Sequence, residues 1–242
     1  MKTRIWAHRG ASAYAPENTL EAFALAAEMG ADGVELDVCC SKDGEVVVCH
    51  DATIDRTSTG TGLVADHTLA ELKEFSFGKR FPGFEQAKIP TLREVFALLL
   101  PTGLTVNVEI KKDSALCDGI EEKCIAIAKE CAMEDRVLYS SFDHESLRII
   151  LKIKPDAKTG LLYGEDIENA ERYAVEQGAA ALHPHYKNLY KGGAIERAHA
   201  VGVKVHPWTV NAEEDIARLL DLGADAIITD KPDLARKIRD AR

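Results

Sequence analysis

Two carboxylates share one side of a short strand-like segment, GVELDV, at residues 33–38. Glu35 and Asp37 are two residues apart, so their side chains point to the same face of an extended chain, while valine and leucine occupy the other face. Like charges this close stay ionised in a low-dielectric site only when positive charge compensates them. The sequence must therefore supply, or bind, that positive charge.

A second segment, TVNVEIKK, repeats the pattern with Glu109 and Lys111 on one face. If the aliphatic faces of both strands pack against helices, Glu35, Asp37 and Glu109 converge in one place. A divalent cation would hold three carboxylates together, and all-oxygen ligands favour Mg²⁺, Ca²⁺ or Mn²⁺ over Zn²⁺. The alternative is a salt-bridge network with Lys111 and Arg9. The same pattern on two strands favours the cation.

Two histidines end strand-like runs, His8 in WAHRG and His50 in VVVCHD. Imidazoles titrate near neutral pH, which suits a pair of groups that donate and accept protons during catalysis. Taken singly, each histidine could equally be a hydrogen-bonded structural residue. Arg9, next to His8, offers a fork of donors to a phosphate oxygen. These residues predict proton transfer at an anionic group.

The elements that must position these side chains alternate regularly along the chain. Strands are expected near residues 4–8, 33–38, 105–110, 137–141, 159–163, 180–183, 203–206 and 225–229, with helices between them. Such alternation is typical of a parallel sheet, and eight repeats in 242 residues favour a closed (β/α)₈ barrel. An open doubly wound sheet is the alternative, but no GxGxxG follows the first strand.

The connection after the second expected strand is long. Residues 39–90 contain a hairpin-like segment, SKDGEVVVCHD, and the small-residue loop DRTSTGTG. We interpret this stretch as an elaborated loop on the face where barrel enzymes keep their sites. With no linker or low-complexity segment, we expect one domain over residues 1–242. Asn18, Asn211 and Asp230 are expected to cap the N-termini of helices.

Bulk composition excludes some functions. The formal net charge of −10 argues against general nucleic-acid binding, which needs basic residues. No apolar run approaches the ~18 residues of a membrane span, so no integral membrane association is expected. The six cysteines contain no CxxC pair, which argues against structural zinc. Cys117, Cys124 and Cys131 are expected on one helix face. Free thiols and the lack of a signal-like segment predict a cytoplasmic location.

The ordered set of motifs resembles the glycerophosphodiester phosphodiesterase family. The segments are HRGASAYAPENTLEAF, GADGVELDVCCSKDGEVVVCHDATIDRTSTGTG, IPTLREV, VNVEIK, SSFD, WTVN and GADAIITDKP, which together cover essentially the whole chain. The resemblance implies a (β/α)₈ barrel that hydrolyses glycerophosphodiesters to sn-glycerol 3-phosphate and an alcohol. It also implies one divalent cation, a small-molecule substrate, and a reaction through a cyclic phosphate.

The resemblance also assigns roles to matching positions. The implied residues are the acid–base pair His8 and His50, the metal ligands Glu35, Asp37 and Glu109, and the phosphate contacts Arg9 and Lys111.

Four further residues carry two interpretations each. Phe142 in SSFD and Trp208 in HPWTVN follow strands, where they would line the barrel mouth and pack against the glycerol or the leaving group. Packing in the core or at the rim is the alternative. Glu17 could support Arg9. Asn18 could support the site or serve only as a helix cap.

Two other functions remain open at this point. Lys111 at a strand end could form a Schiff base in a barrel isomerase or aldolase acting on a sugar phosphate. That enzyme would need a phosphate loop after strands seven and eight, where no glycine pair occurs. The barrel could instead bind a phosphodiester without turnover, although a binder does not need two proton-transferring histidines.

Overall fold

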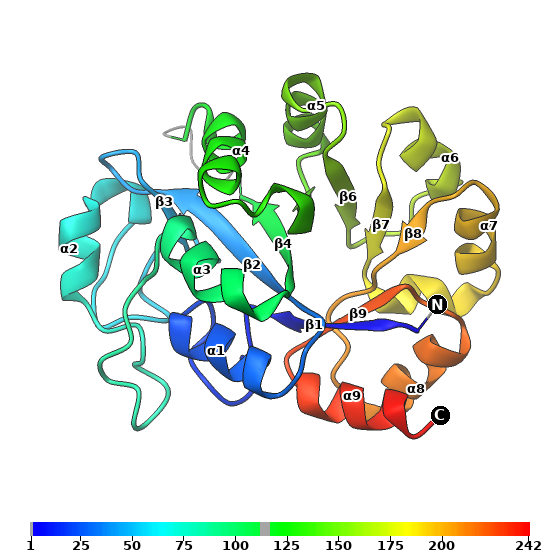
Figure 1. Ribbon diagram of the computed structural model, residues 1–242, viewed down its shortest axis with the longest axis horizontal. Coiled ribbons are helices and arrows are strands. Elements are labelled where there is room, and N and C mark those ends of the chain that lie inside the picture. The colour runs from blue at the N-terminus through cyan, green and yellow to red at the C-terminus, as the bar shows by residue number, and fades with distance from the viewer. Residues whose placement is uncertain (1, 112–116) are drawn as a thin grey trace.

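A curled parallel sheet surrounded by helices forms the body of the protein in the computed structural model, which describes residues 2–111 and 117–242 (Figure 1). The strand order is β8-β7-β6-β5-β4-β2-β1-β9, with β3 attached to β2. The two ends of this order meet where the Asp225 and Ile228 amides donate to the Val205 and Pro207 carbonyls, each at 3.0 Å. The predicted (β/α)₈ barrel is confirmed.

The strands begin and end close to the predicted positions. They are β1 (Arg4–His8), β2 (Gly33–Cys40), β3 (Val46–Val48), β4 (Thr105–Ile110), β5 (Val137–Ser141), β6 (Lys158–Tyr163), β7 (Ala181–Pro184), β8 (Lys204–Val205) and β9 (Ala226–Thr229).

The α-helices lie between the strands and after the last one. They are α1 (Leu20–Glu28), α2 (Leu69–Glu74), α3 (Leu92–Leu99), α4 (Ile120–Glu130), α5 (His144–Ile153), α6 (Ala170–Glu176), α7 (Ala194–Ala200), α8 (Glu213–Asp221) and α9 (Pro232–Asp240). Short 3₁₀ helices are η1 (Val64–Asp66), η2 (Leu100–Thr102), η3 (Glu134–Arg136) and η4 (Tyr186–Lys191).

The alternation of side chains in β2 and β4 separates an aliphatic layer from a polar one. In the register, Leu36 lies beside Val108 and Asp37 lies beside Glu109. The aliphatic residues belong to the large buried cluster between barrel and helices. Each buried leucine or valine stabilises this layer by roughly 1.5–3 kcal/mol. Shifting either strand by one residue would place carboxylates in that layer, so burial fixes the register.

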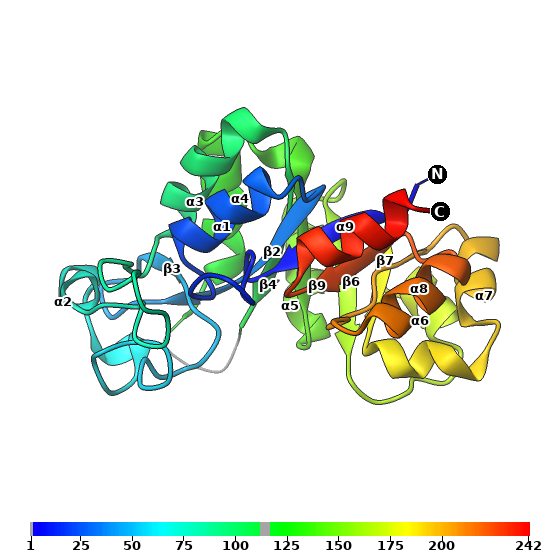
Figure 2. The ribbon, with the colours of Figure 1, turned by 90° about the horizontal axis from the view of Figure 1, so that it is seen from below.

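The elaborated loop after β2 builds a small layer of its own. β3 pairs antiparallel with β2, with Val38 opposite Val48, so the predicted hairpin is present. Val47, Ile54 and Leu72 belong to a separate buried cluster within this insertion. Figure 2 shows α2 and its loops extending to one side of the barrel. That residues 1–242 form a single domain stays a prediction.

Three predicted helix caps are wrong. Thr19, and not Asn18, caps α1 by accepting from the Ala22 amide at 3.3 Å. The residues at the N-caps of α8 and α9 are Ala212 and Lys231. The predicted caps Asn18, Asn211 and Asp230 instead hydrogen-bond to groups around the barrel mouth. Local sequence favours a cap at these positions, but long-range partners take the side chains.

The expectation that all six cysteines are free thiols is also wrong. Cys40 at the end of β2 forms a disulfide with Cys117, with the two Cα atoms 5.4 Å apart. Cys117 precedes α4 instead of lying on it, whereas Cys124 is buried on that helix. The thiol argument for a cytoplasmic location therefore loses its premise. No helix in the described ranges has the length and apolarity needed to cross a membrane.

Candidate active site

Three carboxylates meet on the neighbouring strands β2 and β4, as the strand spacing predicts. One ligand oxygen from each of Glu35, Asp37 and Glu109 lies within 4.8 Å of the others. All three residues are buried, and Asp37 is 0% exposed. Among the described residues, Glu35 Oε1 and Asp37 Oδ1 have no hydrogen-bond partner. Because orphaned buried carboxylate oxygens are costly, this donor set fits a divalent cation with oxygen ligands.

The crowding of these carboxylates changes their ionisation. Burial, followed by the charges of Asp37 and Glu109, raises the pKa of Glu35 well above its ordinary value. Burial and Asp37 raise the pKa of Glu109 to about 7. Burial opposes ionisation of Asp37 as well, but the charges of Arg9, His50 and Lys111 outweigh it and lower the pKa. A bound cation would favour ionisation of all three.

Two basic residues lie against the carboxylates. The backbone amide of Arg9 donates to Glu35 Oε2 at 3.0 Å, and the Nε atom of the Arg9 side chain lies 3.3 Å from Asp37 Oδ2. Lys111 Nζ donates to Glu109 Oε1 at 3.0 Å. The salt-bridge network expected as an alternative to a cation is therefore present, and it also places Lys111 Nζ 3.7 Å from Asp37 Oδ1, but Glu35 Oε1 and Asp37 Oδ1 still lack a hydrogen-bond donor from the described ranges.

A left-handed turn aims the Arg9 amide into the site. Arg9 has a φ of 56° and Gly10 a φ of 82°. A Cβ atom on Gly10 would lie 2.6 Å from the carbonyl carbon of Ala22 in α1. Both the positive φ and the close approach of helix α1 require glycine after Arg9.

Each of the two predicted histidines is held by an aspartate. His8 Nδ1 lies 2.6 Å from Asp230 Oδ1, and His50 Nδ1 lies 2.6 Å from Asp51 Oδ1. Because an ionised carboxylate only accepts hydrogen bonds, Nδ1 carries the hydrogen in both rings. Nε2 of each ring is then the atom that can exchange a proton with a substrate. His8 Nε2 lies 4.0 Å from Glu35 Oε2.

A cavity of about 80 Å³ opens at these residues. Its polar side includes His8, His50 and Glu109. Its apolar side includes Phe142 and Trp208, whose rings meet edge to face with centroids 5.5 Å apart. The lining of the mouth thus combines charged and proton-transferring groups with an apolar wall formed by the rings of Phe142 and Trp208.

The two residues predicted to support the site contact its charged groups. Glu17 Oε1 accepts from Arg9 Nη1 at 2.9 Å. Asn18 Nδ2 donates to Asp37 Oδ2 at 2.8 Å. Both contacts restrict the orientation of side chains that line or border the cavity.

Comparison with known proteins shows which protein family this chain belongs to. The model of the glycerophosphoryl diester phosphodiesterase family matches residues 8–234. The chain belongs to that family. It is therefore an enzyme, a phosphodiesterase, and the family match spans the barrel from His8 into helix α9.

Two curated relatives of the family are similar over nearly their full lengths. A glycerophosphodiester phosphodiesterase of Caldanaerobacter subterraneus subsp. tengcongensis is 47% identical over 237 residues, covering 96% of both chains. A glycerophosphodiester phosphodiesterase of Bacillus altitudinis is 39% identical over 243 residues, covering 98% of both chains.

Solved structures of the family share the fold. A phosphodiesterase of Oleispira antarctica, in complex with the product sn-glycerol-3-phosphate, superposes with a TM-score of 0.85 at 30% identity, covering 99% of this chain and 97% of that one. A glycerophosphodiester phosphodiesterase of Agrobacterium tumefaciens superposes with a TM-score of 0.86 at 29% identity, covering 97% and 99%.

Sequence reasoning missed the residues that hold the two histidines. Asp230 accepts from Asn211 Nδ2 at 2.6 Å and from Ser12 Oγ at 3.1 Å in addition to His8. Asp51 accepts from Arg56 Nε at 2.6 Å in addition to His50. The only local signal was the His50-Asp51 dipeptide. Asp230 follows His8 by more than two hundred residues, so no spacing rule could pair them.

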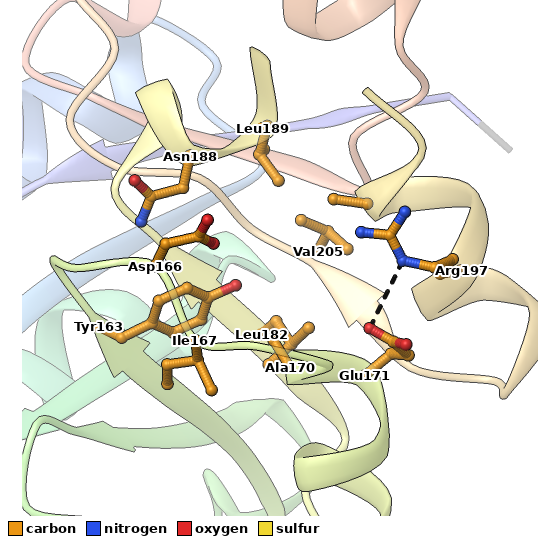
Figure 3. Close-up of a pocket in the computed structure, with 11 residues that line it drawn as sticks. Tyr163, Asp166, Ile167, Ala170, Glu171, Leu182, Asn188, Leu189, Arg197 and Val205 are labelled. Atoms are coloured by element: carbon orange, nitrogen blue, oxygen red, sulfur yellow. Dashed lines mark ion pairs between the residues drawn. The ribbon is translucent and has the colours of Figure 1, made fainter. Parts of the chain in front are cut away.

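A second cavity of this phosphodiesterase lies in the helix layer, outside the barrel (Figure 3). Tyr163 and Asn188 project toward it, and the Arg197 guanidinium lies 3.7 Å from the Glu171 carboxylate at its side. Among the described residues, none lines both this cavity and the mouth cavity. The predicted catalytic residues therefore belong to the mouth alone.

Proposed function

We propose that the protein hydrolyses glycerophosphodiesters to sn-glycerol 3-phosphate and an alcohol. Glu35, Asp37 and Glu109 would hold a divalent cation, Mg²⁺, Ca²⁺ or Mn²⁺, and His8 and His50 would act as general acid and base. The observation that carries the proposal is a cavity lined by two aspartate-held imidazoles, at a cluster of three buried carboxylates of which Glu35 and Asp37 each keep one oxygen without a hydrogen-bond partner in the described part of the chain. The product bound to the Oleispira antarctica relative supports the choice of substrate.

A phosphodiester is an anion, so its binding needs positive charge. Arg9 lines the cavity, and Lys111 lies within 3.0 Å of the Glu109 carboxylate. Both side chains would donate to non-bridging phosphate oxygens, where charge grows in the transition state. When bound, the cation would add the Lewis acidity that stabilises the same charge.

Proton transfer falls to the two histidines. One Nε2 takes the proton of the substrate's 2-hydroxyl as that oxygen bonds to phosphorus, and the other protonates the alkoxide that leaves. Water then opens the cyclic phosphate, with the two imidazoles exchanging roles. Asp230 and Asp51 keep the rings in the required tautomer and orientation. An intramolecular hydroxyl already close to phosphorus also reduces the entropy cost of attack.

The apolar wall gives the mouth a second recognition element. We assign Phe142 and Trp208 to packing against the glycerol carbons or the leaving alcohol. Trp208 Nε1 donates to the His183 carbonyl at 2.7 Å, which fixes the indole, whereas Phe142 is 50% exposed. Glu17 and Asn18 would orient Arg9 and Asp37. The cytoplasmic location remains a prediction.

Family membership argues against the two other functions that the sequence left open, a sugar-phosphate isomerase or aldolase and a phosphodiester-binding protein without turnover. For a Schiff base, Lys111 would have to lose its proton, yet it forms ion pairs with Glu109 and Asp37, which stabilise the charged form. The paired imidazoles would have no use in a protein that only binds its ligand.

Release of sn-glycerol 3-phosphate from glycerophosphocholine, read by a coupled dehydrogenase, tests the proposed function. We expect turnover by the wild type and a loss of ~10²–10⁴-fold in His50→Ala, because a catalytic proton transfer is removed. His199→Ala is the matched control, since His199 also pairs with an aspartate, Asp225 at 2.8 Å, but does not line the mouth. Near-normal turnover in His50→Ala would remove His50 from the mechanism.

A further inference from the structure

Arg56 lies in the loop DRTSTGTG of the insertion and contacts the carboxylates beside His50 and Arg9 without lining the cavity. Its Nε donates to Asp51 Oδ2 at 2.6 Å. Its Nη1 and Nη2 donate to Glu17 Oε2 and Oε1 at 2.6 and 2.7 Å. One guanidinium thus holds two carboxylates, one of them by a bidentate contact, which is the strongest geometry for this pair.

The two carboxylates lead to two different functional groups. Asp51 holds Nδ1 of His50 at 2.6 Å, and Glu17 holds Nη1 of Arg9 at 2.9 Å. Arg56 is therefore the midpoint of a continuous chain from His50 to Arg9. Glu17 belongs to the β1–α1 loop and Asp51 to the insertion after β3, so the guanidinium also links two segments that the barrel strands do not join.

The electrostatics agree with this geometry. Burial opposes the ionisation of Asp51, but hydrogen bonds from Arg56 and His50 outweigh it and lower its pKa to about 2. Burial likewise opposes ionisation of Glu17, and Arg56 and Arg9 together lower its pKa. Both shifts favour the charged form of the carboxylate. Both are therefore fixed acceptors for the groups that they orient.

The aspartates that hold the two histidines differ in their other hydrogen-bond donors. Asp230, which holds His8, accepts from the neutral groups of Ser12 and Asn211. Asp51, which holds His50, depends on the single charged donor Arg56 for its second oxygen. Removal of Arg56 would leave Asp51 free to rotate away from His50. It would also leave Glu17 with Arg9 as its remaining partner, which would draw Arg9 toward Glu17.

We propose that Arg56 is a positioning residue that aligns His50 through Asp51 and Arg9 through Glu17, which couples proton transfer to phosphate binding. The inference rests on the proposed roles of His50 and Arg9. Outer residues of this kind typically contribute about 10–100-fold to activity. A lysine at this position supplies one point charge and no fork, so it can satisfy only one of the two carboxylates well.

A double-mutant cycle on glycerophosphocholine hydrolysis tests this assignment. We expect Arg56→Ala to lower kcat/KM by about 10–100-fold, with both a fall in kcat and a rise in KM. The kcat/KM of Arg56→Lys should lie between those of the wild type and Arg56→Ala. Added guanidinium ion should restore part of the activity that Arg56→Ala loses. In the His50→Ala background, Arg56→Ala should lower kcat by a clearly smaller factor than in the wild type, because the ring that it positions is gone and only its effect on Arg9 remains.

Lys73→Ala is the matched control for disturbance of the insertion. Lys73 forms a comparable ion pair with Glu94 at 2.6 Å and has no contact with the mouth. If Arg56→Ala behaves like Lys73→Ala, or lowers kcat equally in both backgrounds, the positioning role is wrong. If Arg56→Ala fails to fold, Arg56→Lys in both backgrounds gives the same decision. Full activity in His50→Ala would instead overturn the proposed role of His50, and absence of glycerophosphocholine turnover in the wild type would overturn the proposed function itself.

Discussion

At the scale of single residues, the site is a balance between buried acids and the charges placed around them. Glu35 and Glu109 resist ionisation, while Asp37, next to Arg9, ionises readily. One strand thus carries two carboxylates with opposite pKa shifts. A divalent cation compensates such a set because it competes with protons for the same oxygens.

The raised pKa of Glu109 gives a prediction about stability in the absence of divalent cations. Its folded pKa of about 7 lies above the ordinary value of 4.5, so the folded protein binds more protons between these pH values. The free energy of unfolding should therefore fall as pH rises through this window. The difference between the two pKa values corresponds to about 3 kcal/mol.

Urea unfolding in EDTA at pH 4.5 and pH 7.5 measures this loss. Glu109→Gln has no ionisable group at this position and should lose correspondingly less stability between the two pH values. Because the charge of Glu109 also raises the pKa of Glu35, the difference between the two proteins reports Glu109 together with its effect on Glu35. Equal losses in the two proteins would show that Glu109 ionises at its ordinary pKa.

The sequence predicted the residues that strand periodicity controls and missed those that depend on distant loops. Glu35, Asp37 and Glu109 follow from alternation along two strands. Asp230 and Arg56 reach the site through loops whose positions no local pattern encodes. Asn18 shows the limit most clearly, because its sequence context favours a helix cap and only the fold supplies Asp37 as its partner.

At the scale of elements, two neighbouring strands carry the carboxylates, and a disulfide joins the chain near their ends. Cys40 ends β2, and Cys117 follows β4 by a short stretch of chain. The sequence separation between the two cysteines is 77 residues. A link of this length removes many conformations from the unfolded chain, which raises the free energy of unfolding by about 4 kcal/mol on the chain-entropy account.

Urea unfolding with and without a phosphine reductant tests the contribution of this disulfide. The wild type should unfold at a clearly lower urea concentration when reduced, because the unfolded chain gains entropy. A Cys40→Ala/Cys117→Ala protein should unfold at one concentration in both conditions. Cys131→Ala, which removes a cysteine outside the disulfide, should respond to reductant as the wild type does. Identical wild-type midpoints in both conditions would contradict a stabilising link.

Strands were predicted more accurately than helix ends. β1, β4 and β5 have the predicted bounds, because short runs with apolar residues and few breakers, bordered by turns, leave few alternatives. Glycines after α1 and α8 also mark the helix ends, with φ of 71° at Gly30 and 80° at Gly223. N-caps were missed because asparagine and aspartate form the same hydrogen bonds with distant partners as with their own helix.

At the scale of the whole molecule, the barrel reconciles an acidic protein with an anionic substrate. The chain carries a formal net charge of −10, yet Arg9, Arg56 and Lys111 gather at one end of the barrel. The insertion brings His50 to that end, opposite His8 from β1. The other end holds the chain termini, where Lys2 pairs with Asp240 at 2.6 Å and the labelled ends lie close together (Figure 1).

The most direct test of the account is the activity of thoroughly demetallated protein. After EDTA treatment and removal of the chelator, we expect release of sn-glycerol 3-phosphate to fall to background, because the Lewis acidity that stabilises charge on the phosphate is lost. Addition of Mg²⁺, Ca²⁺ or Mn²⁺ should restore activity in the wild type and not in Glu109→Gln. Full activity in the demetallated wild type would contradict the assignment of Glu35, Asp37 and Glu109 as cation ligands.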